Sequence, residues 1–200
     1  MPTRNKDLHG NVPDKSSVAL LLVDVINDLE FEGNDSIIRT TRPMARKIAL
    51  LKARAKREGI VSIYVNDNFG RWKSDFRAQV NHCLAREGSG QFLAQTLRPE
   101  KDDYFVLKPK HSGFFSTTLD TVLRYLETHT LIITGIAGDR CVLFTANDAF
   151  LRDYRVFVPA DCVVSNTPAD NKNALALIER VLGADIRISS KLNISDLKTL

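Results

Sequence analysis

Cysteine and histidine are scarce in this sequence, and their spacing argues against two kinds of site. The chain has three cysteines, Cys83, Cys141 and Cys162, with no CxxC spacing. An odd number without paired spacing argues against a disulfide framework and against a cysteine zinc site. His82 and His111 each lack a second histidine at helical spacing, so a histidine zinc site has little support. We therefore expect no metal and no other cofactor, and a reducing compartment.

Long hydrophobic runs are also missing. Residues 1–17 are polar and show no signal-peptide pattern. The longest apolar stretches, such as Val18–Val23, fall far short of the about 18 residues that suggest a membrane span. We expect a cytoplasmic protein with no membrane anchor and no membrane partner.

A strong excess of one charge sign is missing too. The chain has 28 Lys and Arg against 24 Asp and Glu, which gives a net charge of +4. The densest basic cluster lies in the helix-like run 46–57, which we interpret as a solvated helix face. Because no aromatic interleaving and no nucleic-acid motif accompanies it, we expect no nucleic-acid partner.

What the chain does have is a regular alternation of apolar segments that suit strands with amphipathic segments that suit helices. Its 200 residues, 44% of them hydrophobic, predict a single domain spanning 1–200. A non-alternating apolar run such as Val18–Val23 indicates a strand buried on both faces of a parallel sheet. The pattern predicts a three-layer α/β/α fold, doubly wound, with a mainly parallel six-stranded sheet. The expected strands are 18–23, 60–65, 104–107, 130–134, 155–158 and 184–188, and the expected helices are 42–58, 75–87, 91–97, 117–128, 141–151 and 168–182.

The segment 130–141 combines the features of a reactive site. An apolar strand leads through Gly135 and Gly138 into a helical pattern that begins at Cys141. The first N–H groups of a helix lack partners within the helix and attract negative charge. A cysteine at that place is expected to have a lowered pKa and to act as a nucleophile. The alternative is that Cys141 is a small buried packing residue.

Two further reactive side chains stand at the ends of predicted strands. Asp24 follows the first strand, and Lys108 follows the third. Ligands of open α/β sheets bind beyond the carboxyl ends of the strands, so a catalytic acid is expected at the position of Asp24. A helix cap or a turn aspartate is an equal alternative. Position alone does not make Lys108 catalytic.

Three motifs in register resemble the cysteine-hydrolase branch of the isochorismatase-like family. They are LLLVDVINDLEF at 20–31, VLKPKHSGFF at 106–115 and TGIAGDRCV at 134–142. The resemblance covers about residues 16–188, in the order and spacing of the family. It implies the three-layer hydrolase fold of that family.

The resemblance also implies a catalytic triad of Asp24, Lys108 and Cys141. In the family, the residue matching Asp24 is the general base, and the residue matching Cys141 attacks a carbonyl carbon to form an acyl-thioester. The lysine supplies a fixed positive charge that favours the thiolate and holds the aspartate. The family also has a cis peptide bond matching Ile136–Ala137, and the N–H groups of Ala137 and Cys141 match its oxyanion hole.

Departures from other branches of the family narrow the expected reaction. Isochorismatases proper lack the nucleophilic cysteine, so acyl chemistry on a C–N bond is favoured over vinyl-ether hydrolysis. Nicotinamidases bind a metal through an aspartate and histidines after the second strand, whereas segment 65–72 here has no histidine. We therefore expect a metal-independent hydrolase of a small amide, carbamoyl or ureido compound.

Two other functions stay open at this point. The first is a catalytically silent protein of the same fold that binds a small molecule or regulates. The second is a redox-responsive thiol protein, which would need Cys83 or Cys162 within disulfide reach of Cys141, about 4.4–6.8 Å between Cα atoms.

Five candidates for lining the substrate pocket come from four loops: Phe31, Asn68, Trp72, Phe114 and Arg140. Arg140 could reach a substrate carboxylate, or could be a surface residue of the first helical turn. Members of the family commonly form dimers or tetramers, so the resemblance also implies a homo-oligomer whose neighbouring subunit could complete the pocket.

Overall fold

The strands of the protein form one parallel sheet. A computed structural model describes residues 15–30, 35–68, 75–85 and 87–199. Within these residues the strand order is β3-β2-β1-β4-β5, and β6 pairs with the end of β4. The strands are β1 (Val18–Val23), β2 (Val61–Asp67), β3 (Tyr104–Lys108), β4 (Thr130–Ile136), β5 (Arg155–Phe157) and β6 (Val163–Val164). The parallel pairing places the carboxyl ends of β1, β2, β3 and β4 at the same edge of the sheet.

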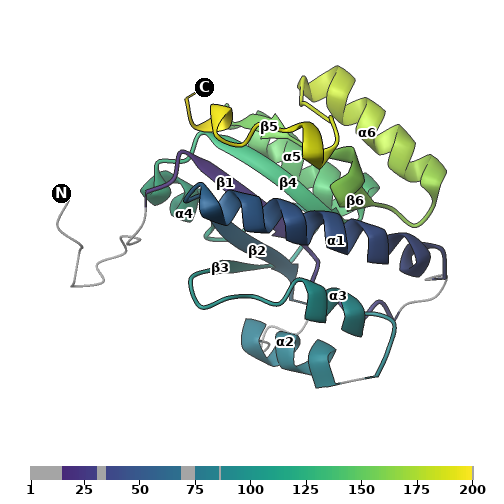
Figure 1. Cartoon of the computed structure of the whole chain (residues 1–200). Coiled ribbons are helices and arrows are strands. Elements are labelled where there is room, and N and C mark those ends of the chain that lie inside the picture. Colours follow the sequence, from purple (N-terminus) through teal and green to yellow (C-terminus); the bar gives the residue numbers. More distant parts are fainter. Residues whose placement is uncertain (1–14, 31–34, 69–74, 86, 200) are drawn as a thin grey trace.

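Helices cover both faces of the sheet (Figure 1). One face carries α1 (Asp35–Arg57), with α2 (Phe76–Ala85) and α3 (Gln91–Thr96) beside it. The other carries α4 (Leu119–Leu126), α5 (Leu143–Phe150) and α6 (Pro168–Leu182). The predicted three-layer α/β/α fold with a six-stranded parallel sheet is confirmed.

The central strand β1 shows why its sequence is apolar without alternation. Leu20 and Leu22 point into the cluster under α1, whereas Leu21 points into the cluster under α4, α5 and α6. All three are fully buried, and each such burial stabilises the fold by about 1.5–3 kcal/mol. A polar side chain on either face would therefore lose these apolar contacts. For this reason the strand carries apolar residues on both faces.

The prediction of a sixth strand at 184–188 is wrong. That segment forms an isolated bridge between Phe157 and Asp185, and the sixth strand is the two-residue β6 beside Gly135 and Ile136. Ala184 is buried and Ile186 is packed against the core below α6. The segment does make backbone hydrogen bonds to the chain around β5, from the N–H of Val158 to Asp185 and from the N–H of Asp185 to Val156, but these do not extend into a strand.

Two helices begin elsewhere than predicted. Helix α1 begins at Asp35 rather than Arg42 and runs through Pro43. A π-helical turn, Gly138–Val142, precedes α5, so Cys141 lies in the turn rather than at the first residue of the helix.

None of the helices in the described part of the chain combines the length and the apolar character that a membrane span needs.

Candidate active site

Asp24 lies directly after the central strand β1, at the carboxyl edge of the sheet. Its backbone takes a left-handed conformation with φ 51°, which aspartate tolerates better than most residues. The Asp24 N–H donates to the carbonyl of Val65 at 2.9 Å, and Oδ1 accepts the N–H of Asp67 at 2.7 Å. The carboxylate is thus buried, at 5% exposure, and fixed by the end of the neighbouring strand.

Lys108 is the last residue of β3, paired in register with Asp67 of β2. Its side chain is fully buried, and Nζ lies 2.8 Å from Oδ2 of Asp24 and 3.6 Å from Oδ2 of Asp67. A buried ammonium group is costly unless carboxylates and hydrogen bonds compensate it. These two carboxylates therefore hold the lysine at the edge of the sheet.

Cys141 completes the cluster from the other side of β1. It lies in the π turn that follows β4, and Lys108 Nζ donates to Sγ at 3.4 Å. The peptide bond Ile136–Ala137, just before the turn, is cis. The structure therefore brings Asp24, Lys108 and Cys141 together from the ends of three parallel strands.

Two glycines lie where the Cys141 turn, residues 138–142, comes close to its neighbours. Gly135 has φ +119°, and a Cβ there would lie 2.0 Å from the carbonyl oxygen of Val23. This backbone contact excludes a side chain, so Gly135 is required for close approach of the two strands. A Cβ on Gly138 would lie 2.6 Å from Oδ1 of Asn171, so neighbouring side chains would have to shift to admit a larger residue there.

Burial and neighbouring charge set the protonation of the three groups. Burial raises the pKa of Asp24, and Lys108 opposes this rise. Burial favours neutral Lys108, but the charges of Asp24 and Cys141 raise the pKa of the lysine above its ordinary value. Burial and the Asp24 carboxylate raise the pKa of Cys141 to about 12. The thiol therefore keeps its proton at neutral pH, beside a carboxylate whose raised pKa makes it a stronger base.

The prediction of a lowered pKa for Cys141 is therefore wrong. That prediction considered the helix N-terminus alone, whereas desolvation and the nearby carboxylate act in the opposite direction and are the larger effects. The thiol becomes nucleophilic only when its proton is transferred.

Two side chains of the cluster were not predicted from the sequence. Asp67 ends β2 and contacts Lys108, so the strand-end argument that indicated Asp24 could have found it. His111 places Nδ1 3.7 Å from Sγ of Cys141. Its signal was weak, because it lies in a loop whose course the sequence does not specify, although it falls within the motif at 106–115.

Two of the predicted pocket-lining residues, Phe31 after the first strand and Trp72 after the second, lie outside the described residues. Asn68 is buried, and its N–H donates to the carbonyl of Lys108 at 3.0 Å. The backbone of Asn68 therefore fastens the end of β2 to the end of β3, and a contact with substrate stays a prediction.

The other two candidates differ in exposure. Phe114 is buried, with its ring 5.9 Å from that of Tyr154 and beneath the guanidinium of Arg152. Arg140 is 58% exposed, and its Nε lies 3.9 Å from Oδ2 of Asp139. The phenylalanine thus packs under helices α4 and α5, whereas the arginine lies at the surface of the Cys141 turn.

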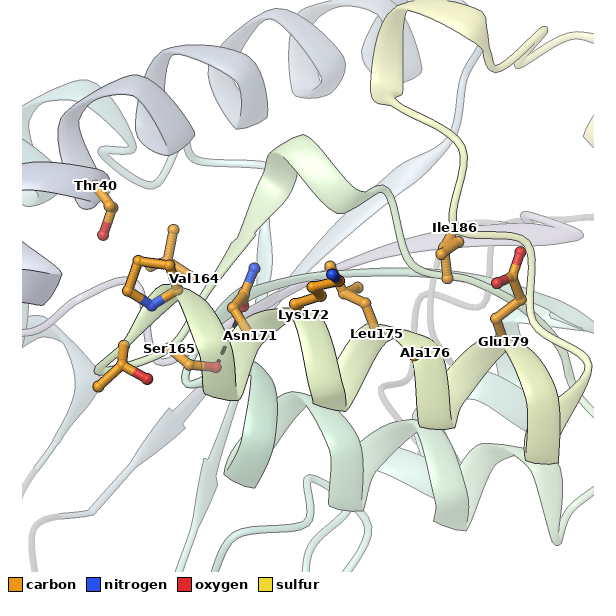
Figure 2. Close-up of a pocket in the computed structure, with 11 residues that line it drawn as sticks. Thr40, Val164, Ser165, Asn171, Lys172, Leu175, Ala176, Glu179 and Ile186 are labelled. Carbon is orange, nitrogen blue, oxygen red and sulfur yellow. Dashed lines mark hydrogen bonds between the residues drawn. The ribbon is translucent and has the colours of Figure 1, made fainter.

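Hydrogen bonds also hold the Cys141 turn from the side of α6. Ser165 and Asn171 are among the residues that line an open groove of about 420 Å³ beside α6, and Figure 2 shows their side chains joined by a hydrogen bond. Ser165 Oγ accepts the N–H of Asp139 at 3.1 Å and donates to Oδ1 of Asn171 at 3.2 Å. Asn171 Nδ2 donates to the carbonyl of Val163 at 3.2 Å. This chain of hydrogen bonds connects the turn to β6 and α6.

We expect Ser165→Ala to lower kcat by about tenfold with KM nearly unchanged, because small misplacements of reacting groups are costly. Steady-state kinetics on any turned-over amide checks this. Thr167→Ala is the matched control: it removes the α6 N-cap, whose Oγ1 accepts the N–H of Asp170. The control is expected to lose about 1 kcal/mol of unfolding free energy while its kcat stays unchanged. Equal kcat losses in both variants would contradict a positioning role for Ser165.

The redox alternative gains no support from the structure. All three cysteines are free, and Cys83 and Cys162 belong to the cluster under α1, whereas Cys141 belongs to the cluster on the opposite face. A redox pair with Cys141 is therefore not indicated. In the part of the chain that the structure describes, no three His, Cys, Asp or Glu side chains are grouped to hold a metal ion.

Comparison with known proteins gives concordant matches over most of the chain. The family model described as Isochorismatase domain matches residues 18–187. An uncharacterized isochorismatase family protein, YaaI of Bacillus subtilis, is 42% identical over 86% of this chain and 94% of its own length. The ureidoacrylate amidohydrolase RutB of Methylorubrum extorquens is 30% identical over 85% of this chain and 79% of its own. The crystal structure of N-carbamoylsarcosine amidase from Thermoplasma acidophilum matches with TM-score 0.67 and 29% identity, covering 88% of this chain and 99% of that one.

Proposed function

Because the chain belongs to the isochorismatase family, we propose that it is a cysteine-dependent amidohydrolase of a small molecule. Its relatives include enzymes named for hydrolysis of a ureido compound and of an N-carbamoyl compound. We propose the same bond class here, a C–N bond in an amide, carbamoyl or ureido group, with no metal ion taking part.

The observation that carries this proposal is the contact of one buried ammonium with both a carboxylate and a thiol. Lys108 Nζ lies 2.8 Å from Asp24 and 3.4 Å from Cys141 Sγ. A lysine shared in this way fixes the carboxylate and the sulfur relative to each other. Nucleophile, base and orienting group are the parts that acyl transfer requires.

In the proposed acylation step, Cys141 Sγ attacks the carbonyl carbon while Asp24 accepts the thiol proton. The C–N bond then breaks, and the proton passes from Asp24 to the leaving nitrogen, which leaves an acyl-thioester on Cys141. The N–H groups of Ala137 and Cys141 are proposed to bind the oxyanion. Water then attacks the thioester carbonyl while Asp24 accepts one of its protons, the C–S bond breaks, and Asp24 returns that proton to the sulfur as the acid product leaves.

The raised pKa of both Asp24 and Cys141 suits this sequence. A thiol that stays protonated until a base removes its proton is protected from unspecific alkylation, and the base is stronger because it is desolvated. Lys108 stabilises the negative charge wherever it lies along the transfer, first on Asp24 and then on sulfur.

We test the proposal by measuring ammonia or amine release from a panel of simple amides, N-carbamoyl amino acids and ureido acids, with a chelator present. We expect turnover that Cys141→Ser lowers by at least about 10³-fold, since the serine hydroxyl is much harder to deprotonate. The serine variant should unfold at nearly the temperature of the parent. Turnover that survives in Cys141→Ser, or that the chelator abolishes, contradicts the proposal.

A further inference from the structure

The open side of the nucleophile carries a group that the proposed mechanism does not use. His111 is exposed, and its Nδ1 lies 3.7 Å from Sγ of Cys141. Its ring rests against that of Phe144, with 5.5 Å between the centroids, which restricts how the imidazole can turn. Since Asp24 and Lys108 are buried, a substrate must approach the sulfur from the exposed side, where His111 lies.

A second donor stands on the same turn as the nucleophile. Arg140 directly precedes Cys141, and its side chain is 58% exposed. Its contact with Asp139 is long, 3.9 Å from Nε to Oδ2. A guanidinium has five N–H donors in a fork that matches a carboxylate. Most of that donor capacity is therefore available to a ligand at the surface of the turn.

The ammonium deeper in the site is already bound by carboxylates. Asp24 and Asp67 both contact Lys108 behind the sulfur. Among the described residues, the donors that remain on the exposed side of Sγ include His111 and Arg140.

We infer that His111 and Arg140 form an anion-binding subsite at the entrance to Cys141, and that the substrates are small amides that carry a carboxylate. This inference rests on the proposed function, because it describes what surrounds the proposed nucleophile. The imidazole donates a hydrogen bond to one carboxylate oxygen and the guanidinium binds the same carboxylate from the turn. The amide carbonyl is then held over Sγ by the opposite end of the molecule.

Two alkylating reagents of nearly equal size test this without knowledge of the substrate. Iodoacetate is an anion and iodoacetamide is its neutral counterpart; both form a C–S bond with Sγ and release iodide. We measure the second-order rate constants for both at Cys141 by peptide mass spectrometry at one pH and low ionic strength. The reference is the same ratio, the iodoacetate rate constant divided by the iodoacetamide rate constant, measured for the thiol of free glutathione.

We expect a ratio in the parent protein about tenfold or more above the reference, because a charged site raises the local concentration of its counter-ion. The ratio should fall to the reference or below it in His111→Gln and in Arg140→Gln, and added salt should reduce it. Arg155→Gln is the matched control, with the same loss of charge on an exposed residue at the start of β5, and should leave the ratio unchanged.

The outcomes separate this inference from the proposed function. A ratio in the parent equal to that of glutathione, or an equal fall in Arg155→Gln, overturns the subsite. If iodoacetamide reactivity of Cys141 still responds to Asp24→Asn in that case, the proposed nucleophile stands without the subsite. If Cys141 is alkylated by neither reagent even in Asp24→Asn, where the thiol is expected to be more reactive, the sulfur is not reached from the side of His111 and the subsite is overturned, while the amide-turnover test decides the proposed function by itself.

Discussion

Asp24→Asn is expected to lower turnover of any amide substrate by about 10²–10⁴-fold, the usual contribution of a positioned general base. Asparagine has nearly the same shape as aspartate and can still accept the Asp67 N–H, which donates to Oδ1 at 2.7 Å. What it cannot do is take the proton of the Cys141 thiol. Steady-state kinetics with the parent and the variant measures the loss.

The same substitution is expected to make the resting thiol more reactive. The Asp24 carboxylate raises the pKa of Cys141, so its removal lowers that pKa. Below the pKa, the thiolate fraction rises about tenfold for each unit by which the pKa falls. Iodoacetamide should therefore alkylate Cys141 faster at pH 8 in the variant, while turnover falls.

Slower turnover together with faster alkylation of the thiol distinguishes loss of the base from general damage to the fold. Asp185→Asn, on the segment bridged to β5, is the matched control and should change neither quantity. A variant Asp24→Asn that keeps full turnover would contradict the assignment of Asp24 as base.

Lys108→Met is expected to destabilise the fold by about 3–5 kcal/mol, as removal of one partner of a buried ion pair does. Methionine fills a similar volume, so the loss arises mainly from the Asp24 carboxylate, which is buried at 5% exposure and loses its partner at 2.8 Å. Urea unfolding measures the change. Lys110→Met, at an exposed lysine in the loop that follows β3, should stay within about 0.5 kcal/mol.

The loss should depend on pH with a defined sign. Burial already raises the folded-state pKa of Asp24, and Lys108 opposes that rise, so its removal raises the pKa further. A folded-state pKa above the unfolded value of about 3.9 means that the folded state binds more protons. The variant should therefore be least destabilised near pH 4 and lose stability as pH rises. A loss that does not change with pH would contradict an uncompensated Asp24.

Strand ends were the informative positions in the sequence. Continuous apolar runs mark strands buried on both faces, and the parallel order that they imply brings their carboxyl ends to one edge. That reasoning placed Asp24 and Lys108 near the segment of Cys141, and the structure has Lys108 in contact with both. The catalytic roles themselves rested on the resemblance to the family and stay predictions.

Features that depend on tertiary packing were not predictable in the same way. The contact of His111 with Cys141 depends on the course of a loop, which no periodicity encodes. The two-residue β6 is too short for any pattern, while 184–188 has the pattern of a strand but forms only an isolated bridge to Phe157. The direction of the Cys141 pKa shift depends on how deeply the thiol is buried, which a local motif does not reveal.

The central claim, that Cys141 forms an acyl-thioester with its substrate, is tested most directly by rapid-quench mass spectrometry during turnover. Acid quenching within a single turnover should trap an adduct on the peptide that contains Cys141, with the mass of the acyl group and without the leaving amine. The adduct should be absent in Cys141→Ser and should form at least about 10²-fold more slowly in Asp24→Asn. Product formation at the full rate with no adduct on Cys141 at any quench time would contradict the mechanism.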